Sequence, residues 1–317
     1  MGPILKLIKI LFLIGYIIPR YTSPPKKNEF CVKNHIVPSV FVIGIEKCGT
    51  STLDAILTQF PDLSHGTNKE HMYFDVSHEP YSEYLKQFPY CNTDYNIQTK
   101  THDATPRYAN PLSNAPMNIS RFYNYFEIPL KKLTFIAMAC SNARRLPSIF
   151  YHLRSNGQIK PNTKLNEWFE MALKCYSLGI RNPMDNVNDP SKPNYELSRI
   201  ALSMGFYGSI FKTYFELFNE SKFIFIDSDY AFMDMQKVGD FLAKELNLKR
   251  KRIRYVHKND HKSFKNIGKV ETLTAENSER LKEFYSLHER KFRDMMKNNV
   301  NLSLKTYPSD NFLEKWT

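Results

Sequence analysis

From Val37 onward, short apolar runs alternate with longer amphipathic segments. Ser39–Ile45 is a continuous apolar run, as expected of a strand buried on both faces of a parallel sheet. The next segment repeats apolar residues at helical spacing and stops at Pro61. Further strands are predicted at Asn96–Thr101, Leu133–Ala139 and Lys222–Asp227, and further helices at Leu165–Leu178, Ile210–Phe218, Met235–Glu245 and Ala275–Met296. Strands alternating with helices predict an α/β fold, a doubly wound parallel sheet in a single domain.

The N-terminus carries an apolar segment of its own. Lys6 and Lys9 precede the run Ile10–Ile18, and Pro19 and Arg20 follow it where a small-residue cleavage site would be expected. The apolar stretch is shorter than the ~20 residues of a usual spanning helix, so it fits a signal peptide or a short signal anchor. We expect an uncleaved anchor over 1–18, a polar stem over 19–36, the main domain over 37–306 and a tail over 307–317. A loop is expected at Arg181–Pro193, which is rich in Asn, Asp and Pro.

The charge balance is basic. The 44 Lys and Arg residues exceed the 32 Asp and Glu residues, which gives a formal net charge of +12. Such a surplus suits an anionic partner, although a merely soluble basic surface explains it equally well. The basic run Leu248–Lys262 is either a solvated loop or a rail for an anionic glycan or a cofactor. We expect no nucleic acid partner, because no DNA- or RNA-binding motif accompanies the charge.

Sequons and cysteines bear on the compartment. Three N-x-S sequons, at Asn118, Asn219 and Asn301, together with the apolar N-terminus favour the secretory lumen. The five cysteines are Cys31, Cys48, Cys91, Cys140 and Cys175. They form no CxxC pair, so metal-site spacing is absent and no metal is expected. Their odd number leaves at least one free thiol, and the pairing of the others is open.

The stretch Phe41–Leu53, FVIGIEKCGTSTL, carries the main chemical signal. Gly44 and Gly49 have the spacing of a nucleotide-binding P-loop, but Lys47 stands two residues before the motif position. A strand, a glycine loop and a helix opening at Thr50 or Ser51 would form an anion site. Lys47 inside the loop can reach a single 5′-phosphate and its bridging atom. The alternatives are an ordinary strand-to-helix turn and a P-loop kinase, against which the position of the lysine argues.

The segment KCGTSTL resembles the 5′-phosphosulfate loop of PAPS-dependent sulfotransferases, K-x-G-T-[ST]-x-L. Asn68–Asp75, NKEHMYFD, resembles the K-E-x-x-[FY]-F-D segment of Golgi carbohydrate sulfotransferases of the heparan sulfate and chondroitin type. Further similar segments follow in the family's order at Thr99–Tyr108, in the block from Gly205 to Tyr230, and at Asn259–Lys269. The ordered set is specific to the family, whereas a single motif would not be.

This resemblance implies sulfonate transfer from PAPS to a carbohydrate hydroxyl or amine, without a metal. It further implies an anionic or neutral glycan acceptor and a single-pass type II Golgi membrane protein with a luminal domain, or alternatively a secreted one. The loop residues implied to bind the cofactor are Lys47, Cys48, Gly49, Thr50, Ser51 and Thr52. The residues implied farther along the chain are Arg145 and Ser148, followed by Lys265, Gly268 and Lys269.

The segment implied to bind the 3′-phosphate departs from the family pattern. The pattern is R-x-P-x-x-R-x-x-S, and this chain reads CSNARRLPS. Arg145 and Ser148 match, but Cys140 replaces the first arginine and Asn142 replaces the proline. Losing a charge-assisted contact to a phosphate costs about 1.5–3 kcal/mol, unless Arg144 or a distant lysine substitutes. A non-catalytic relative that binds glycans or nucleotides is therefore an alternative hypothesis.

The family match points to Glu70 as the general base that takes the proton of the acceptor. A surface ion pair with Lys69 is the alternative interpretation of this glutamate. His102 competes with it, because KTH resembles the segment that carries the histidine base of cytosolic sulfotransferases, which act on small hydroxyl acceptors. We expect Glu70 to be the base, Lys47 to stabilise the leaving phosphate, and Lys100 to support the sulfonate or the acceptor.

Overall fold

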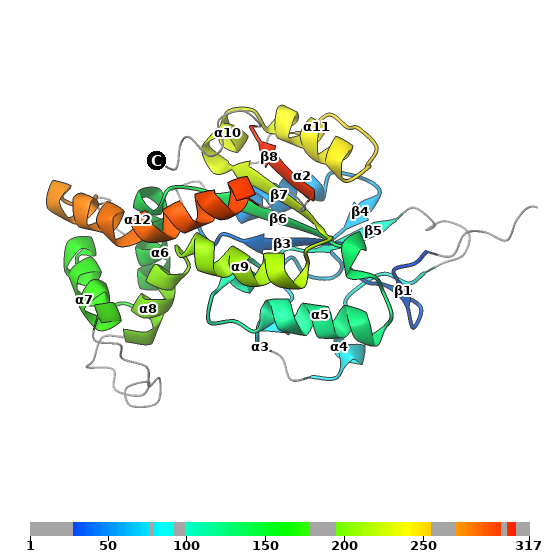
Figure 1. Ribbon diagram of the computed structural model, residues 1–317, viewed down its shortest axis with the longest axis horizontal. Coiled ribbons are helices and arrows are strands. Elements are labelled where there is room, and N and C mark those ends of the chain that lie inside the picture. The colour runs from blue at the N-terminus through cyan, green and yellow to red at the C-terminus, as the bar shows by residue number, and fades with distance from the viewer. Residues whose placement is uncertain are drawn as a thin grey trace, which may run out of the picture.

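A six-stranded sheet forms the centre of the molecule, and all of its strand pairs run parallel (Figure 1). In this computed structural model the described residues are 28–76, 79–91, 99–177, 195–254, 271–298 and 303–308. Across the sheet the strands are β4 (Leu63–Ser64), β5 (Lys100–Asp103), β3 (Val40–Gly44), β6 (Thr134–Ala139), β7 (Lys222–Asp227) and β8 (Ser303–Tyr307).

The central strands are apolar on both faces, and this makes them strands of a covered sheet. Every residue of β3 is buried, and in β6 and β7 only the first residue is partly exposed. Phe41, Phe135 and Phe223 occupy the same level of three neighbouring strands. Their rings stack with centroids 5.7 and 5.2 Å apart. Each such pair adds about 0.5–1.5 kcal/mol to the burial of the rings, which helps to fix the register.

Helices cover both faces of the sheet (Figure 1). Helices α2 (Thr50–Leu57) and α11 (Met235–Glu245) pack together on one face, and α5 (Ala115–Tyr125) and α9 (Tyr207–Leu217) pack together on the other. The shorter helices are α3 (Tyr73–Val76), α4 (Tyr81–Leu85) and α10 (Ser228–Met233), with 3₁₀ turns η1 (Pro106–Ala109) and η2 (Leu130–Lys132).

A second apolar cluster lies to one side of the sheet, at the left of Figure 1. It is formed by α6 (Asn142–Ser155), α7 (Leu165–Ser177), α8 (Tyr195–Ser203) and α12 (Ala275–Asn298). Trp168 is buried in this cluster, and its indole N–H donates to Ser198 Oγ at 3.0 Å. Because α6 directly follows β6, the cluster lies beyond the carboxyl ends of the strands.

The hairpin β1 (Cys31–Val32) and β2 (His35–Ile36) precedes the sheet. A disulfide between Cys31 and Cys91 ties it to the domain, so part of the predicted stem is folded onto the body. Residues 1–18 lie outside the described residues, and so do Arg181–Pro193 and most of the tail. The anchor and the loop therefore stay predictions. None of the described helices has both the length and the apolar character needed to cross a bilayer.

The predicted doubly wound α/β fold is confirmed. The helix at Met235–Glu245 and the strand at Lys222–Asp227 have the predicted bounds, and α2 begins at Thr50. The strand predicted at Asn96–Thr101 is observed at Lys100–Asp103, while residues 92–98 lie outside the described ranges. The sequence did not predict β8, because its polar residues hide an edge strand.

The order of the strands places a crevice. From β3 the chain proceeds to β4 and β5 on one side, and β6, β7 and β8 lie on the other. The winding therefore reverses between β3 and β6. In open parallel sheets, ligands bind outside the carboxyl ends of the strands at such a reversal.

Candidate active site

A cavity of about 880 Å³ opens at the carboxyl ends of the strands, where the winding reverses. This volume is within the range of about 300–1,000 Å³ typical of small-molecule sites. The segments after β3, β5, β6 and β7 all contribute to its lining. The principal residues are Glu46, Lys47, Gly49, Thr50, Ser51, Thr52, Lys69, Glu70, Pro106, Arg107, Arg144, Ser148, His152 and Phe232.

The loop after β3 has a backbone that few residues adopt. Lys47 and Gly49 have φ values of +69° and +99°, and Gly49 is the N-cap of α2. A Cβ added at Gly49 would lie 2.7 Å from Phe232 Cζ, so both conformation and space require glycine there. Helix α2 then begins with Thr50 and Ser51 against the cavity. An anion in the cavity would meet the N-terminal end of this helix, where unpaired N–H groups and the helix dipole favour negative charge.

Lys47 and Glu46 stand side by side in this loop and both line the cavity. Burial lowers the pKa of Lys47, and the neighbouring Glu46 partly opposes this. Burial raises the pKa of Glu46, and Lys47 is the main opposing charge. Each group is therefore held in an environment that disfavours its charged form. An anionic ligand beside Lys47 would favour its ammonium form and raise its pKa.

Lys69 and Glu70 lie across from the start of α2. Lys69 Nζ is 2.6 Å from Glu70 Oε1 and 3.0 Å from Ser51 Oγ. The main chain around them is fixed to the end of β5, because Thr105 Oγ1 accepts from the N–H groups of His71 and Met72 at 3.0 and 3.2 Å. The Glu70 side chain is 32% exposed, so an acceptor can reach it. The ion pair with Lys69 exists, and it lies in the cavity lining.

His102 and Lys100, the other predicted catalytic residues, do not line this cavity. His102 is fully buried on β5, and its Nε2 lies 2.9 Å from Asp54 Oδ1 on α2. Lys100 is at the start of β5, where its Nζ donates to the Leu246 carbonyl oxygen. It lines a separate cavity of about 670 Å³. Of the two residues considered for the base, Glu70 thus belongs to the cavity lining and His102 does not.

The segment after β6 divides its two arginines between two roles. Arg145 is completely buried and donates to Asn142 Oδ1 at 3.0 Å, to the Ala201 carbonyl oxygen at 2.9 Å and to Tyr285 Oη at 3.2 Å. It therefore joins α6 to α8 and α12 and is absent from the cavity lining. Arg144, which matches no position of the pattern, lines the cavity, and so does Ser148.

Arg144 is held by the segment that follows β7. Its Nη1 donates to Ser228 Oγ at 2.9 Å and pairs with Asp229, and its guanidinium lies 5.0 Å from the centroid of the Phe232 ring. Its side chain is nevertheless 40% exposed. A phosphate in the cavity would thus meet Arg144, which lies in the first helical turn after Cys140, the residue at the first arginine position of the family pattern.

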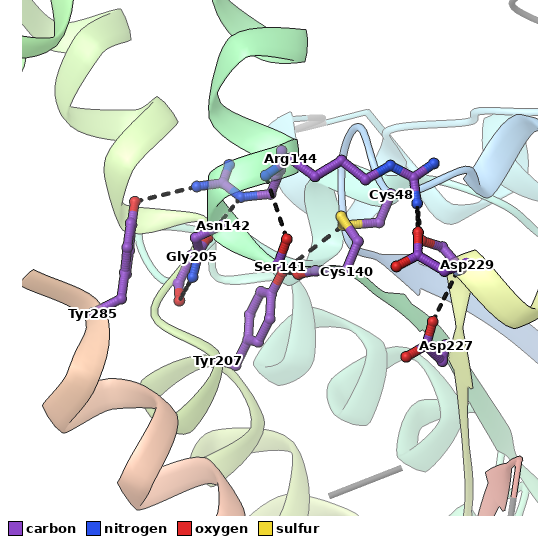
Figure 2. The surroundings of a disulfide bond; sticks show 12 residues. Cys48, Cys140, Ser141, Asn142, Arg144, Gly205, Tyr207, Asp227, Asp229 and Tyr285 are labelled. Atoms are coloured by element: carbon purple, nitrogen blue, oxygen red, sulfur yellow. Dashed lines mark hydrogen bonds and ion pairs between the residues drawn. A yellow bond between two sulfur atoms is a disulfide. The ribbon is translucent and has the colours of Figure 1, made fainter. Parts of the chain in front are cut away.

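Two predicted loop and segment residues are joined covalently. Cys48 and Cys140 form a disulfide with Cα atoms 5.4 Å apart, and both side chains are buried (Figure 2). Cys48, predicted among the cofactor-binding residues, thus has its sulfur in the interior. Both cysteines follow the carboxyl ends of the neighbouring strands β3 and β6. This shared position is the signal from which their pairing could have been predicted. Cys175 is free and buried.

Sequence reasoning also missed His152, on α6. It lines the cavity, and Asn156 Nδ2 lies 3.3 Å from its Nε2. Burial lowers the pKa of His152, the charge of Lys47 lowers it further, and Glu70 opposes both. Lys265, Gly268 and Lys269 lie outside the described residues. Among the described residues, no group of three or more His, Cys, Asp or Glu side chains is placed to hold a metal ion.

Comparison with known proteins identifies the family. The solved structure of a sulfotransferase from Alicyclobacillus acidocaldarius matches with a TM-score of 0.55 at 17% identity, over 82% of this chain and 96% of that chain. At this identity the likeness shows a common fold. No curated protein sequence gives a significant match. A family model described as a sulfotransferase domain matches residues 37–307. Because this match spans most of the chain, the protein belongs to the sulfotransferase family and is a PAPS-dependent transferase.

Proposed function

We propose that this sulfotransferase transfers sulfonate to a hydroxyl or amine of a carbohydrate, a glycosaminoglycan-like glycan, in the Golgi lumen. The placement of Glu70 carries the proposal. This glutamate belongs to the segment that resembles carbohydrate sulfotransferases, and it lies in the cavity lining with Lys47. The histidine that small-hydroxyl sulfotransferases would use, His102, is buried against Asp54 instead.

The cavity fits PAPS by its basic side chains and by the glycine loop that leads into α2. Gly49 provides the left-handed turn that leads into α2, and the start of α2 with Lys47 would hold the 5′-phosphosulfate. Arg144 and Ser148 would hold the 3′-phosphate. When bound, PAPS supplies the sulfonate and a phosphate as leaving group.

The residues of this chain divide the chemistry between them. Glu70 accepts the proton of the acceptor hydroxyl or amine, since its exposed carboxylate is free on one side for an acceptor to approach. Lys69 orients that carboxylate, because its ammonium contacts both Glu70 and Ser51. Lys47 stabilises the negative charge that gathers on the departing phosphate.

Charge and covalent structure support the acceptor and the compartment. The net charge of +12 suits an anionic glycan, and Arg107 with Lys69 adds basic side chains at the cavity. The bonds Cys31–Cys91 and Cys48–Cys140 suit an oxidising compartment such as the secretory lumen. The predicted anchor over residues 1–18 would provide the attachment to the Golgi membrane.

Transfer of ³⁵S from labelled PAPS to a panel of acceptors tests the proposal. The panel contains desulfated heparan and chondroitin chains, neutral oligosaccharides, and small phenols and alcohols, with the Glu70→Gln protein as the matched inactive control. We expect label on a glycan and none on the small hydroxyl compounds. Label on phenols alone would overturn the carbohydrate acceptor. A folded protein that binds the product PAP but labels no glycan would do the same.

A further inference from the structure

The Cys48–Cys140 disulfide joins the two halves of the donor site. Cys48 stands between Lys47 and Gly49 in the phosphosulfate loop, and Cys140 ends the strand from which α6 departs. The bond therefore connects the part of the site that would hold the 5′-phosphosulfate to the part that would hold the 3′-phosphate. Among the described residues, this disulfide is the only covalent cross-link between these two segments (Figure 2).

The loop side of the bond needs such support. Lys47 has a left-handed backbone with φ +69°, which is unfavourable for a residue with a Cβ and persists only where neighbours enforce it. The main-chain hydrogen bonds nearest to it run from Ile45 N to Met138 O at 2.9 Å and from Cys48 N to Ile45 O at 3.0 Å. The disulfide adds a fixed point directly after Lys47.

The other side of the bond is anchored in the core. The Tyr207 hydroxyl donates to the Cys140 carbonyl oxygen at 2.8 Å and lies 3.8 Å from Cys48 Sγ. Ser141, the next residue, caps α6 and accepts from Arg144 N at 3.4 Å. The bond thus fixes the loop to the start of the helix that carries Arg144, as Figure 2 shows.

We propose that Cys48 and Cys140 are positioning residues for the donor nucleotide, and that PAP and PAPS bind tightly only while the two sulfurs are joined. The bond ties the loop that carries Lys47 to the start of the helix that carries Arg144, and so limits how far these two side chains can separate. This inference rests on the assignment of the cavity to PAPS. It concerns the donor alone and is independent of the acceptor.

The inference makes donor affinity dependent on redox state. A dithiol reductant attacks the sulfur of one cysteine, forms a mixed disulfide with it and releases the other cysteine as a thiol. The second thiol of the reductant then displaces the cysteine held in the mixed disulfide. The products are the cyclic disulfide of the reductant and the two thiols of Cys48 and Cys140, which receive the two electrons and two protons. The released loop can then leave the left-handed conformation at Lys47, and we expect PAP affinity to fall at least tenfold.

The experiment uses the second disulfide as its control. In the full-length C31S/C91S variant, Cys48–Cys140 is the one disulfide left among the described residues, so a dithiothreitol titration acts on it alone. Calorimetry measures the Kd for PAP in the oxidised and reduced protein, and alkylation with mass spectrometry counts the thiols. The C48S/C140S variant should show the reduced affinity with and without dithiothreitol. The C31S/C91S variant should have a lower melting temperature than the wild type but the same Kd for PAP.

A reciprocal measurement works even if C48S/C140S does not fold. If PAP prefers the joined form, bound PAP must disfavour reduction by the same factor. The fraction of alkylated Cys48 and Cys140 in the C31S/C91S protein is measured at fixed dithiothreitol ratios with and without saturating PAP. A tenfold preference shifts the midpoint by about 30 mV. An unchanged midpoint, or an unchanged Kd with thiols confirmed, overturns the inference. A wild-type protein that binds no PAP overturns the donor site itself.

Discussion

The two halves of the proposed donor site are built in different ways. The loop after β3 keeps the lysine, the glycine and the hydroxyl residues of the family pattern, and the structure brings them to the cavity. The segment after β6 has lost the first arginine of its pattern to Cys140, and its matching Arg145 is buried in the interior. The match to the family pattern is therefore better on the side where Lys47 would meet the reacting bond.

This difference follows from what each half must do. In the proposed site the loop half would stabilise charge that develops in the transition state, which requires donors at fixed positions. The other half would bind a phosphate that does not react, and any cation of suitable reach can do so. Arg144 has that reach, because it lines the cavity although it stands outside the pattern. Changes in the loop half should therefore affect kcat, and changes in the other half should affect binding.

The largest expected effect is on turnover, at Glu70, which lies across from the start of α2. Glu70→Gln keeps the shape of the side chain but cannot accept a proton, so kcat should fall by the ~10²–10⁴ typical of a lost general base. The Kd for PAP should barely change, since the carboxylate does not hold the nucleotide. His102→Asn should cost far less, because His102 is buried away from the cavity. Steady-state kinetics with ³⁵S-labelled PAPS would measure both. The reverse ranking of the two variants would contradict the assignment of the base.

Lys47→Met tests the catalytic contribution of the loop half. The methionine retains most of the apolar stem but removes the charge beside the leaving phosphate. We expect kcat to fall by about 10²–10³, as for other lost donors to a developing anion. The Kd for PAP should rise by a smaller factor, which calorimetry can measure. If kcat stays constant and only the KM for PAPS rises, Lys47 is a binding residue and the contrast between the two halves fails.

The fold and the loop half could be predicted because their signals are local. The buried run at Val40–Gly44 and the helical spacing after it specify strand and helix without distant contacts. Ser303–Tyr307 could not be recognised as β8, because pairing with β7 and not composition makes it a strand. Glu70 was predicted from the family pattern. The segment that carries it is hydrogen-bonded to the end of β5.

The remaining site residues depend on tertiary packing that spacing does not reveal. Arg144 and Arg145 are neighbours in sequence, but helix geometry turns one toward the cavity and the other toward Tyr285. His102 lies in a strand that is covered by α2, so its partner is Asp54, 48 positions earlier in the chain. Lys100 begins that strand, so it lies at the opposite end of the sheet from the cavity. These placements depend on how the helices pack against the sheet, which the sequence pattern does not specify.

Arg144→Ala tests the binding half. Removing a charge-assisted phosphate contact worth about 1.5–3 kcal/mol should raise the Kd for PAP by roughly 10- to 100-fold. The affinity for adenosine 5′-monophosphate, which has no 3′-phosphate, should change little. Calorimetry with both nucleotides therefore reports on the 3′-phosphate alone. Ser148→Ala is the matched neutral variant and should cost less, as expected of an uncharged hydrogen bond. Equal losses for both nucleotides in the Arg144→Ala protein would show that Arg144 acts elsewhere.

The smallest expected effect concerns His102, which is buried on β5 and does not line the cavity. Burial lowers the pKa of His102 below its ordinary value of 6.5, against the opposing effect of Asp54. The unfolded chain therefore binds this proton more readily than the folded one. Stability from the neutral His102 is fully present above pH 6.5 and is lost as the pH falls below it, toward the pKa of the folded state. Urea unfolding at pH 7.5 and at more acidic pH measures this loss.

His102→Gln is the variant that isolates this effect, since its amide can still donate to Asp54 but does not titrate. We expect the Gln protein to lose less unfolding free energy on acidification than the wild type, with each unit of pKa difference worth about 1.4 kcal/mol. His152→Gln is the matched control, because its histidine also has a lowered pKa but is only partly buried and lines the cavity. It should alter the acid loss of stability less than His102→Gln does. If His102→Gln leaves the acid loss unchanged but removes a pH dependence of kcat, then His102 titrates in catalysis. The base would then lie on β5, and the division between reacting and supporting residues would have to be drawn elsewhere.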